Sequence, residues 1–303
     1  MGASKSGVPK PAAGRCTASE AALSAFLPLL FYGAAAEAVW MLLEAVWRTS
    51  GIQALTGEAG AALISDKILP QLASGTAAAI ISLWYWPKLR NEKMELAGAG
   101  WPAGRQNAGK WLSSFWRFPA SGACYCIGMS GLICLAGTAL GQAGISEAAL
   151  AETAAGGAEA AVSGTAAAAA GVLTFLCTGL VIPFAEEILF RGLMYRRLRK
   201  RFGIRACALL TAFIFGIYHG NVPQGLYAGM MGLFLALLAE RFQTVTATAS
   251  VHIAANLTAL TLDAVSAGMW TESYRLAVWG LAIGGLAAWA FLLRGLFGET
   301  NAL

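Results

Sequence analysis

Long apolar stretches separated by short polar segments dominate the pattern of this chain. Each stretch reaches or approaches the length of about 20 residues that an α-helix needs to cross about 30 Å of hydrocarbon. The pattern therefore predicts an all-α, polytopic integral membrane protein with about eight transmembrane helices. The expected spans are residues 22–47, 70–87, 118–141, 165–193, 204–219, 224–240, 244–262 and 274–294.

The charges between the spans predict the orientation of the helices. Lys and Arg collect in residues 1–21, 88–117 and 196–205, whereas the alternate loops are acidic or poor in charge. Basic loops stay on the cytoplasmic side of a membrane. We therefore expect both termini in the cytoplasm, with residues 1–21 as a cytoplasmic tail and an even number of spans between the termini.

The composition agrees with a membrane protein. The 303 residues are 57% hydrophobic and 12% charged, and the mean hydropathy is +0.62. Soluble proteins carry about 25% charged residues, so this chain has too few to cover a soluble exterior. The net charge of +5 is spread over several loops, which argues against nucleic-acid binding. None of the six cysteines forms a CxxC ligand pair, and we interpret them as apolar packing residues.

Glycine spacing predicts how some of the helices pack. Two small residues four positions apart let neighbouring membrane helices approach closely. We therefore interpret three such pairs as packing positions: Gly137/Gly141, Gly225/Gly229 and Gly280/Gly284.

Three charged residues interrupt the fourth span: Glu186, Glu187 and Arg191. Charge inside a membrane span is costly and points to function. Residues four apart share a face of an α-helix, so Glu187 and Arg191 are predicted to pair, while Glu186 points to another side. Glu186 would then be a free carboxylate, which suits a general acid or base. The alternative interpretation is an ordinary ion pair near the cytoplasmic end of the helix.

The two histidines of the chain lie in later apolar runs. His219 follows Phe215 by four positions and His252 precedes Asn256 by four, so the members of each pair share a helix face. Counted at about 1.5 Å per residue from the basic loops, Glu186 and the two histidines reach similar depths in the membrane. The sequence therefore predicts one site built from three spans.

Buried carboxylate, imidazole and amide groups together fit the activation of water for hydrolysis. Glu186 and His219 would activate the water, while His252 and Asn256 would donate hydrogen bonds to the developing oxyanion. Alternatively, Glu186, His219 and His252 would hold a divalent metal such as zinc, which makes its bound water more acidic. The residues themselves leave both mechanisms open.

Other classes of membrane protein explain fewer of these residues. The histidines are 33 positions apart, so they cannot form an HExxH zinc helix. Gly128-Met129-Ser130-Gly131 matches the GxSG motif of rhomboid proteases, but it precedes both histidines, whereas rhomboids place HxxxN earlier. A rhomboid-like serine protease using Ser130 is one alternative. A non-catalytic membrane scaffold or immunity protein is a second, and an ion-coupled transporter is a third.

With these motifs in view, the chain resembles the CAAX-protease and bacteriocin-processing family (CPBP, also called Abi) of intramembrane proteases. The family motifs EExxxR, FxxxH and HxxxN occur in this order, as Glu186-Glu187…Arg191, Phe215…His219 and His252…Asn256. The likeness covers roughly residues 175–262. No motif is recognised in the membrane helices of 22–163, and we interpret 164–303 as the protease domain with a final helix.

The resemblance implies an α-helical endopeptidase that cleaves a membrane-associated peptide or protein, either a prenylated CAAX-like substrate or a bacteriocin-type one. By position, it implies that Glu186 is the base with His219 beside it, that His252 and Asn256 bind the oxyanion, and that Glu187 and Arg191 support the site. Both a metalloprotease mechanism and a metal-free glutamate mechanism have been argued for the family. The expected location is the lipid bilayer of a bacterial inner (plasma) membrane.

Overall fold

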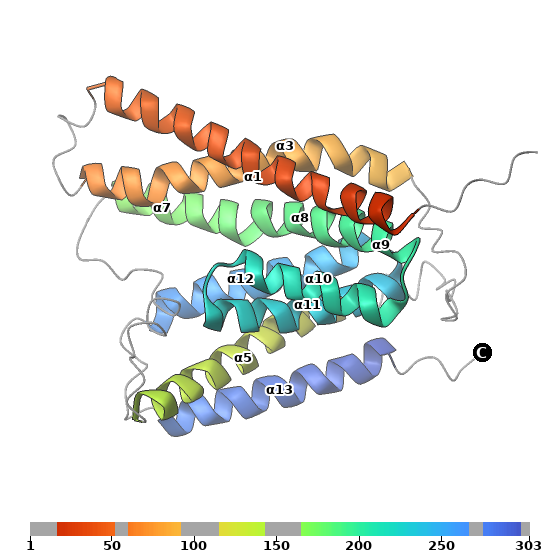
Figure 1. Ribbon diagram of the computed structural model, residues 1–303. Coiled ribbons are helices and arrows are strands. Elements are labelled where there is room, and N and C mark those ends of the chain that lie inside the picture. Colours follow the sequence, from red (N-terminus) through yellow and green to blue (C-terminus); the bar gives the residue numbers. More distant parts are fainter. Residues whose placement is uncertain (1–16, 52–59, 92–114, 143–164, 267–274, 298–303) are drawn as a thin grey trace, which may run out of the picture.

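Helices account for nearly all of the described chain. The computed structural model describes residues 17–51, 60–91, 115–142, 165–266 and 275–297, and within these ranges no residue lies in a β-strand. They form eight helical passes (Figure 1). In order these are α1 (Ala18–Thr49); η1 (Ile64–Ile68) with α3 (Leu69–Asn91); α5 (Arg117–Gln142); α7 (Thr165–Leu176), η2 (Cys177–Val181), α8 (Ile182–Glu187), η3 (Ile188–Tyr195) and α9 (Arg196–Arg199) as one pass; α10 (Ile204–Tyr218); α11 (Val222–Phe242); α12 (Val245–Ser266); and α13 (Arg275–Phe297).

The eight passes coincide with the eight predicted spans. Seven are long and apolar enough to cross a membrane, whereas α10 has only 15 residues. At 1.5 Å per residue α10 is about 22 Å long, which is less than the thickness of the hydrocarbon layer. The all-α membrane fold is therefore confirmed. The bounds differ most at the second pass, whose helix begins at residue 60 instead of 70, and the fourth pass continues to Arg199 instead of ending at residue 193.

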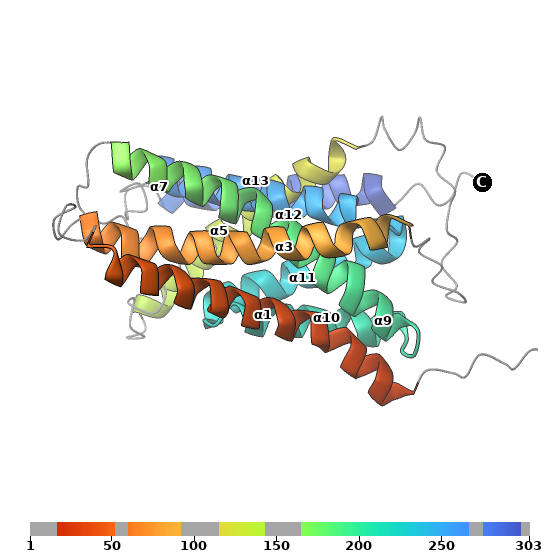
Figure 2. The same cartoon turned by 90° about the horizontal axis from the view of Figure 1, so that it is seen from above.

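Successive passes run in opposite directions, so the start of α1 and the end of α13 lie at the same end of the bundle (right in Figure 1). The helix α1 packs on α3, and α3 packs on the fourth pass; α12 joins the fourth pass to α5, and α5 joins α12 to α13. The hairpin of α10 and α11 packs on η3 and α12. Figure 2 shows the same layers from above.

Basic residues gather at the end of the bundle where α1 begins. The turn between the fourth pass and α10 and its flanks carry Arg196, Arg197, Arg199, Lys200, Arg201 and Arg205. The tail residues Lys5, Lys10 and Arg15 and the segments 92–114 and 143–164 lie outside the described residues. The placement of this end in the cytoplasm stays a prediction.

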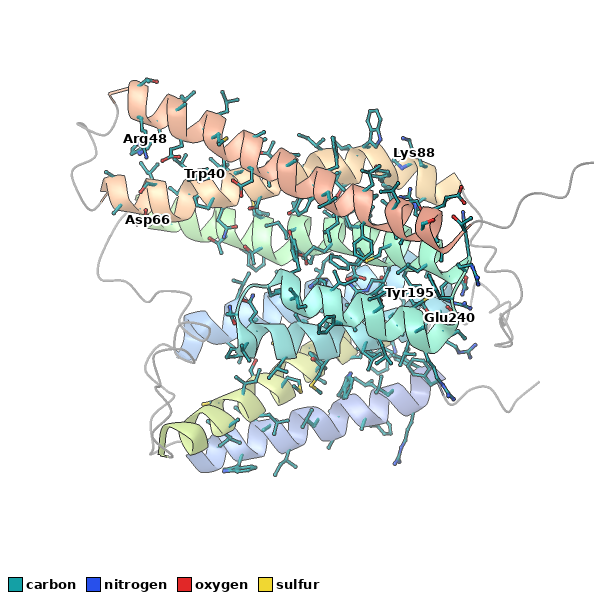
Figure 3. The ribbon with its side chains drawn as sticks, in the orientation of Figure 1. Trp40, Arg48, Asp66, Lys88, Tyr195 and Glu240 are labelled. Carbon is teal, nitrogen blue, oxygen red and sulfur yellow. The ribbon has the colours of Figure 1, made fainter. Side chains whose placement is uncertain are left out.

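A buried ion pair anchors the fourth pass at this end. Arg199 binds both carboxylate oxygens of Glu240 in α11, with Nε–Oε2 at 2.9 Å and Nη2–Oε1 at 3.0 Å. The Tyr195 hydroxyl donates to the same Oε2 at 2.8 Å (Figure 3). Arg197 donates to the backbone carbonyl of Ser24 in α1. These contacts hold the helix that carries the two glutamates in a defined register against α1 and α11.

Two large apolar clusters form most of the core of the described bundle, and a third, small one lies between α5 and α13. The first core packs η3 against α1, α3 and α10, with Ile188 and Phe190 fully buried. The second packs α5 against α11, α12 and α13, with Tyr125 and Val251 fully buried. Helices from 22–163 and from 164–303 contribute to both cores, so the site-bearing helices are supported by both parts of the chain.

The predicted glycine pairs have different environments. A Cβ added at Gly225 would meet a backbone oxygen of α10 at 3.0 Å, so the pair Gly225/Gly229 allows close helix packing as predicted. Gly280 and Gly284 have nothing within 4 Å of an added Cβ, so the prediction for that pair is wrong because these residues lie on an open face of α13. The surroundings of Gly137/Gly141 lie outside the described residues.

The fourth pass is not the regular α-helix that the pattern predicts. The short α-helix α8, which ends with Glu186 and Glu187, lies between two π-helical segments, η2 and η3. In a π-helix each N–H bonds to the carbonyl five residues earlier instead of four, and such segments are frequent at functional sites. Pro183 lies in the first turn of α8 and has no N–H. The glutamates therefore lie at the end of a short α-helical stretch between two wider π-helical segments.

Candidate active site

The fourth pass, α10 and α12 bring the predicted site residues to one region of the bundle. The two glutamates and Arg191 lie on α8 and η3, His219 follows the end of α10, and His252 lies on α12. The exposed fraction is 6% for Glu186, 0% for Glu187, 1% for Arg191 and 4% for His252. Four ionisable groups are thus buried together in the interior of the bundle.

The predicted pair of Glu187 and Arg191 is confirmed. Arg191 Nη1 donates to Glu187 Oε1 at 2.7 Å. Arg191 Nη2 donates to the backbone carbonyl of Gly232 in α11 at 3.1 Å, and the guanidinium lies 4.6 Å from the centre of the Phe215 ring. The arginine is therefore held by an ion pair, a backbone acceptor and an aromatic face. These contacts compensate part of the cost of burying its charge.

His252 lies between the two glutamates. Its Nδ1 is 2.9 Å from Glu187 Oε1, a hydrogen bond in which the imidazole must donate because the carboxylate accepts from Arg191 as well. Its Nε2 lies 3.7 Å from Glu186 Oε2, which is too long for a hydrogen bond. His252 is therefore hydrogen-bonded to Glu187 and faces Glu186.

Glu186 is the less constrained of the two carboxylates. Glu187 is tied to both Arg191 and His252, whereas Glu186 faces His252 without a hydrogen bond among the described residues. Adjacent residues of a helix point about 100° apart, which explains why only one of the two reaches Arg191. The division into a paired and an available carboxylate therefore agrees with the expected geometry.

His219 reaches the region through an aromatic contact. Its Nδ1 lies 2.7 Å from the carbonyl oxygen of Phe215. A carbonyl can only accept, so Nδ1 carries the proton, and in the neutral ring Nε2 is left as an acceptor. The Phe215 ring packs edge-on against His219 at 4.8 Å and against His252 at 5.6 Å between ring centres. No hydrogen bond joins His219 to Glu186 within the described part of the chain.

Asn256 lies one turn beyond His252 on α12 and contacts a different part of the fourth pass. Its Nδ2 donates to the backbone carbonyl of Thr178 in η2 at 3.0 Å. Thr178 in turn donates its hydroxyl to Gln71 of α3 at 2.9 Å. Sequence reasoning did not identify Thr178 or Gln71. Both are polar residues within predicted apolar spans, and this feature could have identified them.

The three residues expected to hold a metal ion do not converge as ligands. Within the described ranges, no three His, Cys, Asp or Glu side chains are arranged to hold a metal ion. Of the proposed ligands, Glu186 and His252 face each other, while His219 bonds to its own helix. The prediction that Glu186, His219 and His252 form one ligand group therefore does not fit this arrangement, and we derive no step through a metal.

The GxSG sequence has a packing environment. A Cβ added at Gly128 would meet Leu286 of α13 at 2.8 Å, and one added at Gly131 would meet Ala282 at 2.7 Å. Ser130 lies 3.8 Å from the sulfur of Cys126 one turn earlier and has no described contact with either histidine. These glycines therefore allow α5 and α13 to approach closely, and the arrangement gives no support to a serine nucleophile.

The fold and the site define a class: a helical, multi-pass membrane protein in which two carboxylates, a histidine and an arginine are buried together. The comparison with protein families agrees with this class. Residues 168–258 match the family described as type II CAAX prenyl endopeptidase Rce1-like. All six candidate residues lie inside this segment. The segment is therefore Rce1-like, and the resemblance to CAAX-type intramembrane proteases is confirmed.

The match covers less than a third of the 303-residue chain, and the helices before residue 168 lie outside it. No curated protein and no solved structure matches the chain. The family match supports a protease, that is a hydrolase, in a protein with several membrane-spanning helices.

Proposed function

We propose that this protein is an intramembrane endopeptidase that hydrolyses a peptide bond in a membrane-associated substrate. The observation that carries the proposal is the buried array in which His252 contacts both Glu186 and Glu187, with Arg191 paired to Glu187. Burying these charged groups costs free energy, and apolar residues would pack the helices without that cost. It lies in the segment that is similar to CAAX endopeptidases.

In the proposed mechanism Glu186 takes a proton from water with the help of His219, whose Nε2 is available as an acceptor. The resulting hydroxide attacks the carbonyl carbon of the substrate, and the carbonyl electrons move to the oxygen. His252 and Asn256 donate hydrogen bonds to that oxyanion. As the C–N bond breaks, Glu186 returns its proton to the leaving amine.

Glu187 and Arg191 have supporting roles in this mechanism. Glu187 fixes the proton of His252 on Nδ1 and the orientation of the ring, because it accepts that N–H at 2.9 Å. Arg191 balances the charge of Glu187. This ion pair compensates part of the cost of burying the two charges in an apolar environment.

The substrate that we propose is a prenylated CAAX-like or bacteriocin-type peptide, since the matched family is described as prenyl endopeptidases. The protease domain would comprise residues 164–303. The proposed location is the inner (plasma) membrane with both termini in the cytoplasm, in agreement with the basic residues around the turn between α9 and α10.

Cleavage of membrane-tethered peptides, with and without a prenyl group, tests the proposal. The purified protein is compared with Glu186→Ala and His219→Ala, and with Glu44→Ala as a matched control, because Glu44 lies in an exposed pair on α1. We expect turnover to fall by at least a hundredfold in the two site variants and to stay unchanged in the control. Unchanged turnover in both site variants would refute the assignment, and no cleavage by the unaltered protein would favour the scaffold or immunity alternative.

A further inference from the structure

The backbone carbonyl of Thr178 lacks the two donors that an α-helix or a π-helix would supply to it. In an α-helix it would accept from the N–H of Ile182, but that N–H bonds to the carbonyl of Cys177 because the segment is π-helical. In the π-helical pattern it would accept from residue 183, which is a proline and has no N–H. Both backbone donors are therefore absent for the same local reason, the combination of a π-helix with Pro183.

Asn256 supplies the missing hydrogen bond. Its Nδ2 donates to the Thr178 carbonyl at 3.0 Å. A carbonyl oxygen only accepts, so this contact determines which end of the Asn256 amide is nitrogen and which is oxygen. The nitrogen carries two hydrogens, and only one is needed for Thr178. The second N–H then has a defined direction and can donate to a substrate.

The helix α3 holds the other side of this π-helical segment. The Thr178 hydroxyl donates to Gln71 Oε1 at 2.9 Å. One turn further along α3, a Cβ added at Gly75 would meet the sulfur of Cys177 at 2.5 Å, so only glycine allows this approach. On the opposite side, a Cβ added at Gly179 would meet Leu257 of α12 at 2.6 Å. The segment 177–179 is therefore clamped between α3 and α12.

We propose that Gln71, Thr178 and Pro183 are positioning residues that orient the Asn256 amide toward the substrate. Pro183 leaves the Thr178 carbonyl open, Asn256 bonds to it, and Gln71 holds Thr178 from a helix that lies outside the Rce1-like segment. The inference rests on the proposed function in one respect, namely that Asn256 binds the oxyanion. It assigns a role in the site to the N-terminal helices, in which no motif is recognised.

Kinetic measurements on conservative variants test the proposal. Thr178→Val and Gln71→Met remove the hydrogen bond with little change in volume, and Pro183→Ala supplies a competing N–H. We expect each to lower kcat about tenfold with KM nearly unchanged, and Thr178→Ser to retain the activity. Thr258→Val is the matched control, because the Thr258 hydroxyl donates to the carbonyl of Ala254 in its own helix at 2.7 Å.

Measurements in the Asn256→Ala variant distinguish an effect of Thr178 on the Asn256 amide from a general loss of structure. This variant should lose about a hundredfold in kcat, as expected for one oxyanion donor. Adding Thr178→Val to it should then cause no further loss. If Asn256→Ala is slow while Thr178→Val, Gln71→Met and Pro183→Ala turn over like the unaltered protein, the positioning role is wrong and the proposed function stands.

A measurement that needs no activity decides the inference if the proposed function itself fails. The chain has five asparagines, so selective ¹⁵N-asparagine labelling gives few side-chain amide signals, and Asn256→Ala identifies that of Asn256 by its absence. We expect the two Asn256 amide protons to shift in Thr178→Val, Gln71→Met and Pro183→Ala but not in Thr258→Val. An Asn256 signal that is the same in all four variants would overturn the inference, whatever the peptidase assay shows.

Discussion

Removing one partner of the buried ion pair should destabilise the protein far more than removing its exposed counterpart. The change is Arg191→Met, which keeps the length of the side chain and removes the charge. Arg191 and Glu187 are paired at 2.7 Å with side-chain exposures of 1% and 0%. At about 4 Å between the charge centres and an effective dielectric constant of about 20, their attraction is about 4 kcal/mol.

Loss of the arginine leaves Glu187 buried, with His252 as its remaining ion-pair partner among the described residues. Uncompensated buried charges cost about 3–5 kcal/mol, and because His252 remains we expect a loss of about 3 kcal/mol in the free energy of unfolding. The chain provides a matched control in Arg48→Met. Arg48 pairs with Glu44 at the same spacing of four residues, but the side-chain exposures are 72% and 26% (Arg48 is labelled in Figure 3). Exposed pairs contribute less than about 1 kcal/mol.

The assay is reversible unfolding of the purified protein in mixed detergent micelles, followed by circular dichroism. A double variant, Glu187→Gln with Arg191→Met, removes both charges while its amide oxygen still accepts from His252. It should recover at least half of the stability lost in Arg191→Met, because no unpaired charge is left. The reasoning is refuted if Arg191→Met costs no more than Arg48→Met, or if the double variant is the least stable of the set.

Three further outcomes are expected. Glu186→Gln should abolish cleavage while unfolding at the same detergent fraction as the unaltered protein, since it removes the base but preserves the volume; residual turnover above a hundredth would contradict the role of Glu186. Cleavage should survive exhaustive chelation, because the described residues do not converge as a ligand set; loss of activity that zinc restores would show the opposite. Ser130→Ala should cleave normally, whereas Gly131→Leu should unfold more easily, because an added Cβ lies 2.7 Å from Ala282; abolished cleavage in Ser130→Ala would revive the serine mechanism.

Local periodicity accounted for much of the site. The pairing of Glu187 with Arg191 was predictable because residues four apart are neighbours on a helix. A similar depth for the three motifs was expected from counting residues from the ends of their spans. Periodicity could not predict the contact between His252 and Glu187, because these residues are 65 positions apart. That contact depends on how α12 packs against the fourth pass.

The glycine pairs illustrate the same limit. Gly225/Gly229 and Gly280/Gly284 have the same spacing in apolar helices, yet the first pair packs against α10 and the second lies open. Conversely, the GxSG sequence matches a motif of serine proteases, but its two glycines lie where α5 packs against α13. A motif of small residues therefore indicates that another helix can approach closely, but it does not identify that helix.

The sequence by itself determined the number and order of the membrane passes, because the length of an apolar run and the charges that bound it decide whether a helix crosses a bilayer. It also determined which polar residues stand inside those passes. Only the tertiary structure decided which of these residues meet and in what backbone geometry. The π-helical segment at 177–181 shows the physical reason. Pro183 has no N–H to donate to the carbonyl of Thr178, and this follows from the local sequence. That carbonyl binds Asn256 because α12 packs against the fourth pass, and the Thr178 side chain binds Gln71 because α3 packs there as well.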